Sequence, residues 1–406
     1  MRILHTADWH FGRTLEGRSR MPEQAAFVEE LAAIVKDEAI DLVLIAGDVY
    51  DSVNPPAAAE SLYYEALAKL SDNGRRAVSV IAGNHDHPDR VSAATPLAAR
   101  QGVSMVGFPQ ERALSVRVSG TGETAVIAAL PYPSEARLNE LLHASIDEEG
   151  LRAAYTDRVG RLMASLASAF RPDTVNLAMS HIYVLGGSET ESERPIQVGG
   201  AYTVHPSALR VGQQYTALGH LHRPQRVDGD ETMRYSGSPL AYSFSEAGQA
   251  KSVVVFDAVP GQAVLPREIY LSSGRPLVRW QAAGGLAEVY RWLDEGRDPR
   301  AWIELELSLT EALTMEQIGQ LRSSREGLVQ IRPVYQGLGG AEAADGDRRR
   351  GSVPPEELFR RFFKRQNNGA EADDALVALF LELLRDDDES PDSEAAEAYA
   401  GKEETR

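Results

Sequence analysis

Residues 78–88, VSVIAGNHDHP, lead a short apolar run directly into a turn that holds an amide and two histidines. Apolar runs of this length are typical of buried strands, and such strands end in turn-forming residues such as Gly83 and Asn84. One interpretation of the turn is therefore structural, with two surface histidines. The other is a functional turn, because Asn84, His85 and Asp86 carry side chains that bind metals or move protons. This stretch alone leaves both interpretations open.

Strand and helix patterns alternate around this turn. The runs 2–7, 41–47 and 78–83 have the length and composition of strands, and helical periodicity covers 22–39 and 55–74. Strands separated by helices predict βαβ units and a mostly parallel sheet that is buried on both faces. The first domain is expected to span residues 1–275. Its later strands are predicted at 175–181 and 215–222, followed by antiparallel strands at 233–237, 251–258 and 268–272.

The rest of the chain predicts smaller units. Residues 276–338 have a βαβαβ-like pattern, with strands at PLVRWQ, AWIELELSL and LVQIRPVY, and are expected to form a small α+β capping domain. A Gly-rich linker is expected at 339–353, and a helical arm at 354–386 with an apolar stripe flanked by basic residues. Residues 387–406 have the composition of a disordered acidic tail.

Composition limits the functions that fit. Of 406 residues, 43% are hydrophobic and 25% are charged, which is typical of globular domains, and the apolar runs are too short to span a membrane. With no cysteine, any metal must be held by His, Asp, Glu or Asn. The start lacks the pattern of a signal peptide, so a cytoplasmic location is expected. The net charge of −18 argues against a broad basic DNA-binding face, although it does not exclude a site where metal ions supply positive charge.

Metal-ligating side chains follow five of the apolar runs, at the point where each run ends. In α/β sheets, ligands collect beyond the carboxyl ends of the strands, so these side chains are expected to converge. Two pairs, Asp8/His10 and His220/His222, have i, i+2 spacing, which in extended chain points both side chains to one face. The predicted cluster consists of Asp8, His10, Asp48, Asn84, His181, His220 and His222.

Seven nitrogen and oxygen ligands are too many for one structural ion, which is typically held by four. They suit two divalent ions that share a carboxylate, the arrangement used for displacement at phosphorus. Manganese fits this mixed set of imidazole, carboxylate and amide oxygen better than magnesium, which prefers oxygen ligands. The prediction is therefore a site for two divalent ions, with Mn²⁺ as the expected metal.

The motifs DxH at 8–10, GD at 47–48, GNHD at 83–86, His181 and GHxH at 219–222 resemble those of calcineurin-like metallophosphoesterases. This resemblance implies an α/β sandwich of two sheets flanked by helices. Longer stretches, among them MRILHTADWHFGRTLEG and RYSGSPLAYSFSE, resemble the family of D subunits of bacterial SbcCD nucleases, which repair DNA double-strand breaks. The resemblance is dense to about residue 257 and loose beyond it.

The family resemblance implies roles for the individual residues. Asp8, His10, Asp48 and His222 would hold one ion, and Asp48, Asn84, His181 and His220 the other, with Asp48 as the bridge. His85 would act on the scissile phosphate or the leaving oxygen. Two interpretations of Asp86 stay open, orienting His85 or capping the next helix, and Asp51 is a candidate for supporting His85. Candidate substrate-binding residues are Arg13, Ser236 and Ser238.

Three functions compete at this point. The first is a DNA nuclease acting at ends and hairpins, as a homodimer in a heterotetramer with a coiled-coil ATPase that controls access of duplex DNA, associated with the nucleoid during function. The second is a free-standing phosphoesterase for a small molecule or phosphoprotein. The third is an inactive scaffold, which the complete ligand set disfavours. The cap, linker and arm favour the first, because an enzyme for small substrates has no evident need of them.

Overall fold

The computed structural model describes residues 1–134, 137, 148–193, 202–311 and 313–335, with isolated positions between 356 and 380. By contacts the chain divides into two units, Met1–Val334 and Tyr335–Arg406. The predicted linker and acidic tail lie outside the described residues, as does most of the predicted arm. Within the second unit, the rings of Phe359 and Phe380 stack with their centroids 4.2 Å apart. No helix in the described part of the chain is long and apolar enough to cross a membrane.

Two six-stranded sheets face each other in the first unit. The strands of the first sheet are, in order, β16 (Arg267–Tyr270), β15 (Ser252–Asp257), β1 (Arg2–Thr6), β4 (Leu42–Ala46), β5 (Ala77–Ile81) and β6 (Val103–Val106). The strands of the second are β13 (Gln225–Val227), β14 (Asp230–Tyr235), β12 (Tyr215–Gly219), β9 (Val175–His181), β8 (Thr124–Leu130) and β7 (Leu114–Arg117). Short pairs are formed by β2 (Thr14–Leu15) with β3 (Arg18–Ser19), and by β10 (Tyr183–Val184) with β11 (Thr203–Val204).

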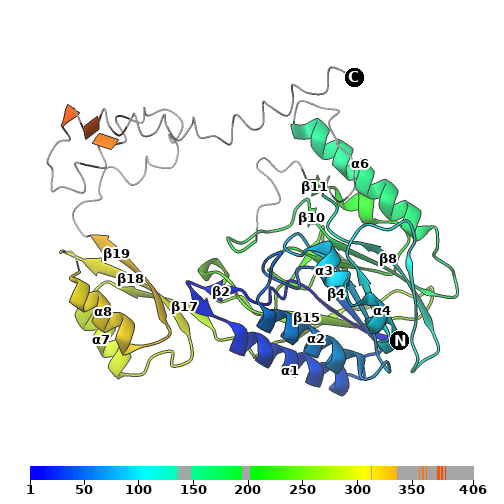
Figure 1. Ribbon diagram of the computed structural model, residues 1–406, viewed down its shortest axis with the longest axis horizontal. Helices are drawn as coiled ribbons and strands as arrows, with labels where there is room; N and C mark the ends of the chain where they lie inside the picture. Colours follow the sequence, from blue (N-terminus) through cyan, green and yellow to red (C-terminus); the bar gives the residue numbers. More distant parts are fainter. Residues whose placement is uncertain are drawn as a thin grey trace, which may run out of the picture. The chain divides into compact units, whose positions relative to one another are not determined.

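Helices cover the outer faces of both sheets. Figure 1 shows α1 (Met21–Asp37) and α2 (Ala57–Ser71) on one side of the sandwich and α6 (Glu148–Ala167) on the other. Residues from both sheets form a core between the two sheets, including Ile3, Leu44 and Ile127. The fold is therefore a four-layer α/β sandwich, as predicted. The shorter helices α3 (Pro88–Ser92) and α4 (Thr95–Ala98) follow β5.

The parallel strands follow from the predicted βαβ pattern. β1 pairs in parallel with β4, and β4 with β5, which confirms the expected units. The helix α1 forms where predicted, with Pro22 in its first turn and Phe27, Val28 and Leu31 buried on one face. The pairing of one strand, β14, differs from the prediction. β14 pairs antiparallel with β13 but parallel with β12, whereas β15 and β16 are antiparallel as predicted.

Residues 277–335 form a third sheet with its own core. It consists of β17 (Leu277–Ala282), β18 (Trp302–Leu309) and β19 (Leu328–Tyr335), and its helices are α7 (Leu286–Asp294) and α8 (Met315–Ser324). These are the predicted strands and helices. Trp280, Ile303 and Leu321 belong to a separate apolar cluster, so this part buries its own surface. Its role as a cap over the substrate stays a prediction.

A buried ion pair joins this sheet to α1. Arg20 is fully buried, and its guanidinium donates two hydrogen bonds to Glu23, at 2.5 and 2.9 Å. Glu23 also accepts from the indole of Trp302, at 3.0 Å, and from the backbone amide of Arg275, at 2.7 Å. One carboxylate therefore neutralises a buried cation and holds the smaller sheet against the sandwich.

We expect Glu23→Ala to lower the free energy of unfolding by about 3–5 kcal/mol, because it leaves the buried Arg20 guanidinium without its counter-charge. Denaturant unfolding followed by circular dichroism measures this. Glu29→Ala on the same helix is the control: Glu29 is exposed and pairs with Lys69 at the surface, so a loss below about 1 kcal/mol is expected. Equal losses for the two variants would contradict the assignment.

Candidate metal centre

Five strand ends from both sheets supply the predicted site residues. Those from the first sheet follow β1, β4 and β5, which are adjacent and parallel, and those from the second lie at the ends of β9 and β12, which also run parallel. The residues are Asp8 and His10 after β1, Asp48 after β4, Asn84 and His85 after β5, His181 at the end of β9, and His220 and His222 after β12.

Two glycines let the strand ends approach each other. A Cβ atom at Gly83 would lie 2.0 Å from the Oδ1 atom of Asp48, and one at Gly219 would lie 1.9 Å from the backbone oxygen of Ala46. Real Cβ atoms essentially never come so close, so a larger residue at Gly83 would separate the turns after β4 and β5, and one at Gly219 would push the two sheets apart. These glycines therefore set how tightly the site closes.

Four of the predicted ligands have a left-handed backbone. The φ angles are 56° at Asp8, 47° at His10, 49° at Asp48 and 108° at His220. The i, i+2 spacing of the paired ligands predicts extended chain between them, and this prediction is wrong. Instead, the segment after β1 bends and runs beside the segment after β4, with hydrogen bonds such as that from the His10 amide to the Asp48 carbonyl, at 3.0 Å. Asp and His tolerate such angles better than most residues, at a cost of about 1–3 kcal/mol each.

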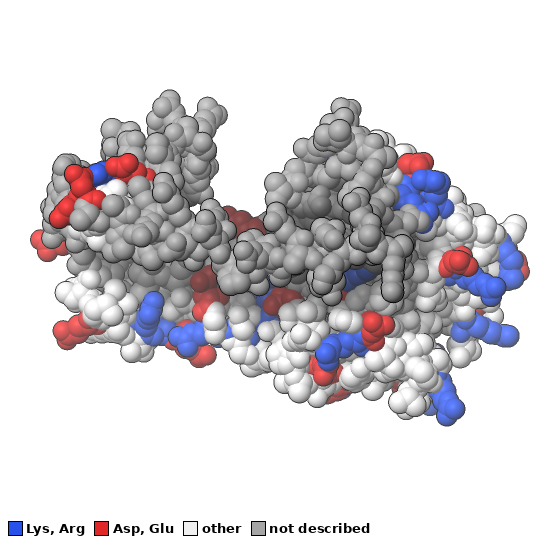
Figure 2. All heavy atoms as spheres, turned by 45° about the horizontal axis from the view of Figure 1, so that its top comes forward, with Lys and Arg blue, Asp and Glu red and all other residues white. Residues whose placement is uncertain are grey.

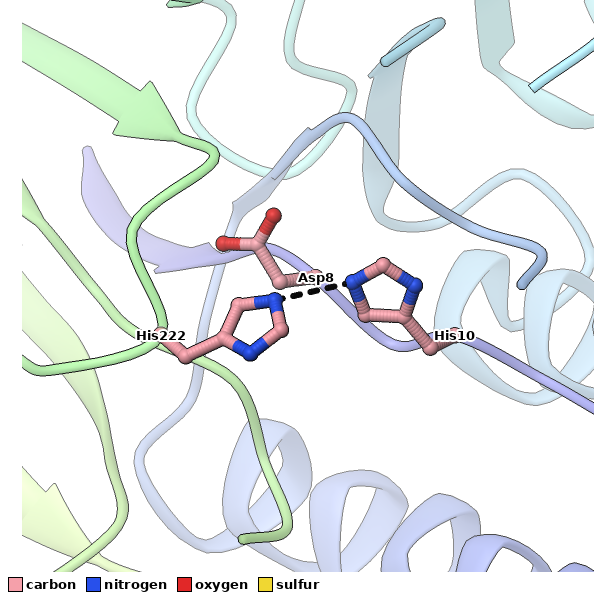
Figure 3. A group of neighbouring side chains, drawn as sticks. All are labelled: Asp8, His10 and His222. Atoms are coloured by element: carbon pink, nitrogen blue, oxygen red, sulfur yellow. Dashed lines mark hydrogen bonds between the residues drawn. The ribbon is translucent and has the colours of Figure 1, made fainter. Parts of the chain in front are cut away.

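Asp8, His10 and His222 form the first group of ligand atoms (Figure 3). The Nε2 atoms of the two histidines are 3.0 Å apart and face each other. The Oδ2 atom of Asp48 lies 3.6 Å from Nε2 of His10. These four residues are the predicted ligands of one ion.

Asn84, His181 and His220 form the second group together with Asp48. The Oδ1 atom of Asn84 lies 2.9 Å from Nε2 of His181 and 3.2 Å from Nδ1 of His220. Oδ2 of Asp48 lies 3.4 Å from the same Nε2 atom of His181. Asp8 also approaches His181, at 3.9 Å, but only at Nδ1, which donates to the Ala46 carbonyl. Asp48 is therefore the carboxylate that the two groups share.

Burial and charge make this cluster suited to cations. Burial raises the pKa of Asp8 well above its ordinary value. Burial also opposes the charge on Asp48, but the neighbouring His181 and His85 hold its pKa well below the usual range. For His181, burial lowers the pKa, and the charge of Asp48 more than offsets this and raises it to about 9. Asp48 thus keeps its negative charge in spite of burial, which favours a cation beside it.

The donor set fits two divalent ions. Ligand bonds of about 2.0–2.2 Å place the atoms around one ion about 3–4 Å apart, and the distances above lie in that range. The two nitrogens of His10 differ in their surroundings: the buried Nδ1 atom has no hydrogen-bond partner among the described residues and lies 3.6 Å from a carboxylate oxygen of Asp51, whereas Nε2 lies near His222 and Asp48. Nε2 of His10 is therefore the atom that faces the other ligands.

His85 lies at the edge of this cluster, beside an open cleft of about 330 Å³. Its Nδ1 atom donates to the backbone carbonyl of Asp51, at 2.7 Å, so a carbonyl and not a carboxylate orients the ring. Neither interpretation of Asp86 holds. Its buried carboxylate accepts from the backbone amides of Val49, Tyr50 and Gly83 and so ties the turn after β5 to the one after β4. His87 is exposed.

The chain is similar to known proteins along most of its length. A family model described as calcineurin-like phosphoesterase matches residues 1–224, and one described as type 5 capsule protein repressor C-terminal domain matches residues 273–367. The D subunit of the SbcCD nuclease of Bacillus subtilis (strain 168) is 53% identical over 387 residues, which cover 94% of this chain and 97% of that protein. The D subunit of the SbcCD nuclease of Rhodobacter capsulatus is 37% identical over 310 residues, covering 72% of this chain and 75% of that protein.

The chain belongs to the family of SbcCD nuclease D subunits, which are calcineurin-like phosphoesterases. A solved dimetal phosphatase from Danio rerio is 14% identical, with a TM-score of 0.37 over 66% of this chain and 95% of that one, and is too distant to support a conclusion. Membership of this metallophosphoesterase family agrees with the site, whose residues fit a dinuclear metal centre.

Of the three predicted substrate-binding residues, one lies in the cleft and two are buried. Arg13 lines the cleft beside His85, and its guanidinium donates to the Ser192 carbonyl, at 2.8 Å. Ser236 and Ser238 are fully buried, and their hydroxyls donate to backbone carbonyls of their own loop. Substrate binding by these two serines stays a prediction, which this geometry does not favour.

Two residues that support the backbone of the site are not predicted by the sequence pattern. The side chain of Gln24 on α1 donates to the His10 carbonyl, at 2.8 Å. The guanidinium of Arg137 donates to the carbonyls of Gly83 and Asp86, at 2.9 and 2.6 Å, on either side of Asn84 and His85. Neither residue has a motif or a period that marks it, because each acts on backbone oxygens.

We expect Asp48→Asn to weaken the binding of both ions, because its carboxylate faces both ligand groups. His10→Ala should weaken mainly one ion and His181→Ala mainly the other. Titration calorimetry with Mn²⁺, with anomalous scattering to locate the ions, measures this. Asp89→Asn, a change of the same kind at an exposed position, should bind metal like the wild type. Two ions bound with unchanged affinity in Asp48→Asn would rule out the shared carboxylate.

Proposed function

We propose that this protein is the nuclease component of an SbcCD-like complex and hydrolyses phosphodiester bonds at DNA ends and hairpins. The observation that carries the proposal is the position of His85. It lies beside the seven predicted metal ligands and lines an open cleft with Arg13. The names of the relatives from Bacillus subtilis and Rhodobacter capsulatus support the same function.

The residues around the cleft have distinct tasks. A pair of divalent ions supplies Lewis acidity to a phosphoryl group and lowers the pKa of water. Because Nδ1 of His85 donates to the Asp51 carbonyl, its Nε2 atom is the one available to substrate. When the ring is doubly protonated, the Nε2–H group can donate to a phosphoryl oxygen or protonate the leaving oxygen. Arg13 offers a cation to the same cleft for a phosphate group.

We infer manganese as the metal. The ligand set combines four imidazoles, two carboxylates and one amide oxygen. Magnesium prefers oxygen ligands and keeps several of its waters, whereas imidazole ligands suit later divalent metals. Exchange of Mn²⁺ for Mg²⁺ is therefore expected to reduce turnover.

A partner protein is part of the proposal. On the described part of the face in Figure 2, Lys and Arg are interspersed with Asp and Glu and form no continuous basic stripe. Together with the net charge of −18, this suggests that a partner supplies much of the surface that binds duplex DNA. We propose an SbcC-like ATPase as that partner, bound by the arm at 354–386, and a homodimer of this chain in the resulting heterotetramer. Such a complex acts in the cytoplasm, at the nucleoid.

The purified chain tests the function directly. Manganese-dependent cleavage of single-stranded and hairpin DNA is assayed beside hydrolysis of a chromogenic phosphodiester. Cleavage of both supports the proposal. Hydrolysis of the small ester with no cleavage of DNA, alone or with the ATPase, would instead indicate a phosphoesterase for small substrates.

We expect His85→Ala to reduce DNA cleavage by about 10²–10⁴-fold while both ions stay bound, because His85 acts on the substrate. Single-turnover cleavage and calorimetry with Mn²⁺ separate the two effects. His87→Ala is the matched control, since His87 is exposed and two residues away. Turnover near the wild-type rate would refute the role of His85, and loss of an ion would make it a ligand.

Deletion of residues 341–406 tests the arm. The first unit, Met1–Val334, contains the whole site, so the shortened chain should still bind metal and nick single-stranded DNA. It should no longer co-purify with the ATPase or show ATP-stimulated digestion of duplex ends. Unchanged affinity for the ATPase would show that the arm is not the docking element.

A further inference from the structure

A closed ring of hydrogen bonds passes through His222, one of the predicted metal ligands. The hydroxyl of Ser192 lies 2.6 Å from Nδ1 of His222, and 2.8 Å from the hydroxyl of Thr190. The hydroxyl of Thr190 donates to Oε2 of Glu193, at 2.6 Å. The ring closes because Oε1 of Glu193 accepts from the backbone amide of His222, at 2.8 Å. All three partners belong to the polar segment 188–193, which no sequence motif marked.

The carboxylate gives this ring a direction. An ionised carboxylate can only accept, so the hydroxyl proton of Thr190 points to Glu193. Each hydroxyl carries one proton, and Thr190 must therefore accept from Ser192. The hydroxyl of Ser192 has then used its own proton and must accept from His222. The proton of the His222 imidazole therefore lies on Nδ1, and Nε2 carries a lone pair.

We propose that Thr190, Ser192 and Glu193 are positioning residues that fix the tautomer of His222, so that Nε2 is always ready to bind a metal ion. The proposal rests on the proposed function in one respect, the assignment of His222 as a ligand. It extends that function by naming the residues that set the protonation of one ligand. Outer partners of metal-bound histidines commonly orient the ring and fix its tautomer in this way.

Burial makes the direction of the ring persistent. Ser192 and Glu193 are 3% and 8% exposed and Thr190 is half-buried, so most of the ring is shielded from water although Ser192 and Glu193 border the cleft. The only other acceptor described near Nδ1 of His222 is Oε1 of Glu246, at 3.8 Å, which is beyond hydrogen-bond distance. Glu246 is also paired with the ammonium of Lys251. Ser192 is therefore the partner that decides the state of His222.

The test compares Thr190→Val with Thr190→Ser. Valine has nearly the shape of threonine but lacks the hydroxyl, so the ring loses its direction, whereas serine keeps it. The tautomer is measured by two-bond ¹H–¹⁵N correlation spectra of metal-free protein labelled with ¹⁵N-histidine, with His222→Gln to assign the signal. We expect Nδ1–H alone in the wild type and in Thr190→Ser, and a mixture of tautomers in Thr190→Val. Calorimetry should show one of the two Mn²⁺ ions bound about 10–100-fold more weakly in Thr190→Val only.

Two further variants complete the test. Glu189→Gln changes a neighbouring carboxylate outside the ring and should leave the tautomer and both affinities unchanged. Ser192→Ala removes the hydroxyl that accepts from Nδ1 of His222; if Thr190→Val does not fold, this variant decides, and it too should lose the pure Nδ1–H state. An unchanged Nδ1–H signal with unchanged Mn²⁺ affinity would overturn the proposal. These readouts need no DNA, so a wild-type protein that binds two Mn²⁺ ions but cuts no DNA, alone or with the ATPase, refutes the proposed function and leaves this test intact.

Discussion

The burial of two acidic side chains between the sheets is the constraint on which the rest of the site depends. Asp8 and Asp48 are almost completely buried, and an uncompensated buried charge is costly. Their neighbours are arranged to offset this cost. Backbone amides of His220 and His85 donate to the two carboxylates, and imidazoles surround them. The strained backbone of the ligand-bearing turns persists because these contacts outweigh it.

One turn of α1 connects the smaller sheet to the candidate metal centre. Glu23 in that turn holds Trp302 of the smaller sheet, and its neighbour Gln24 holds the loop of His10 through the carbonyl oxygen. Tyr242 lies between these regions, with its ring 5.5 Å from that of His10 and 5.9 Å from the guanidinium of Arg20. The first helix is therefore part of the support of the site as well as a cover for the sheet.

Much of the fold and the ligand set could be predicted because each depends on a regular pattern. Parallel strands such as β4 and β5 are largely apolar runs. The loops that follow them carry Asp48 and Asn84 at the same edge of the sheet. The route by which Asp8 and His10 converge could not be predicted, because a left-handed turn leaves no period in the sequence. The pairing of β14 with β12 depends on neighbours distant in sequence. Ser192 and Glu193 lie in a polar loop, where nothing in the local pattern distinguishes a buried carboxylate from an exposed one.

The origin of the ligands in both sheets has a consequence during synthesis of the protein. Asp8 and His222 belong to the same group of ligand atoms but are separated by more than half of the chain. Once β5 has been translated, the growing polypeptide already carries Asp8, His10, Asp48 and Asn84, whereas β9 and β12, which bring the other ligands, come later in the chain. Hydrolytic capacity therefore appears only when the second sheet has closed on the first. A prematurely terminated or proteolysed fragment that lacks β12 consequently lacks His220 and His222 and cannot assemble the candidate metal centre.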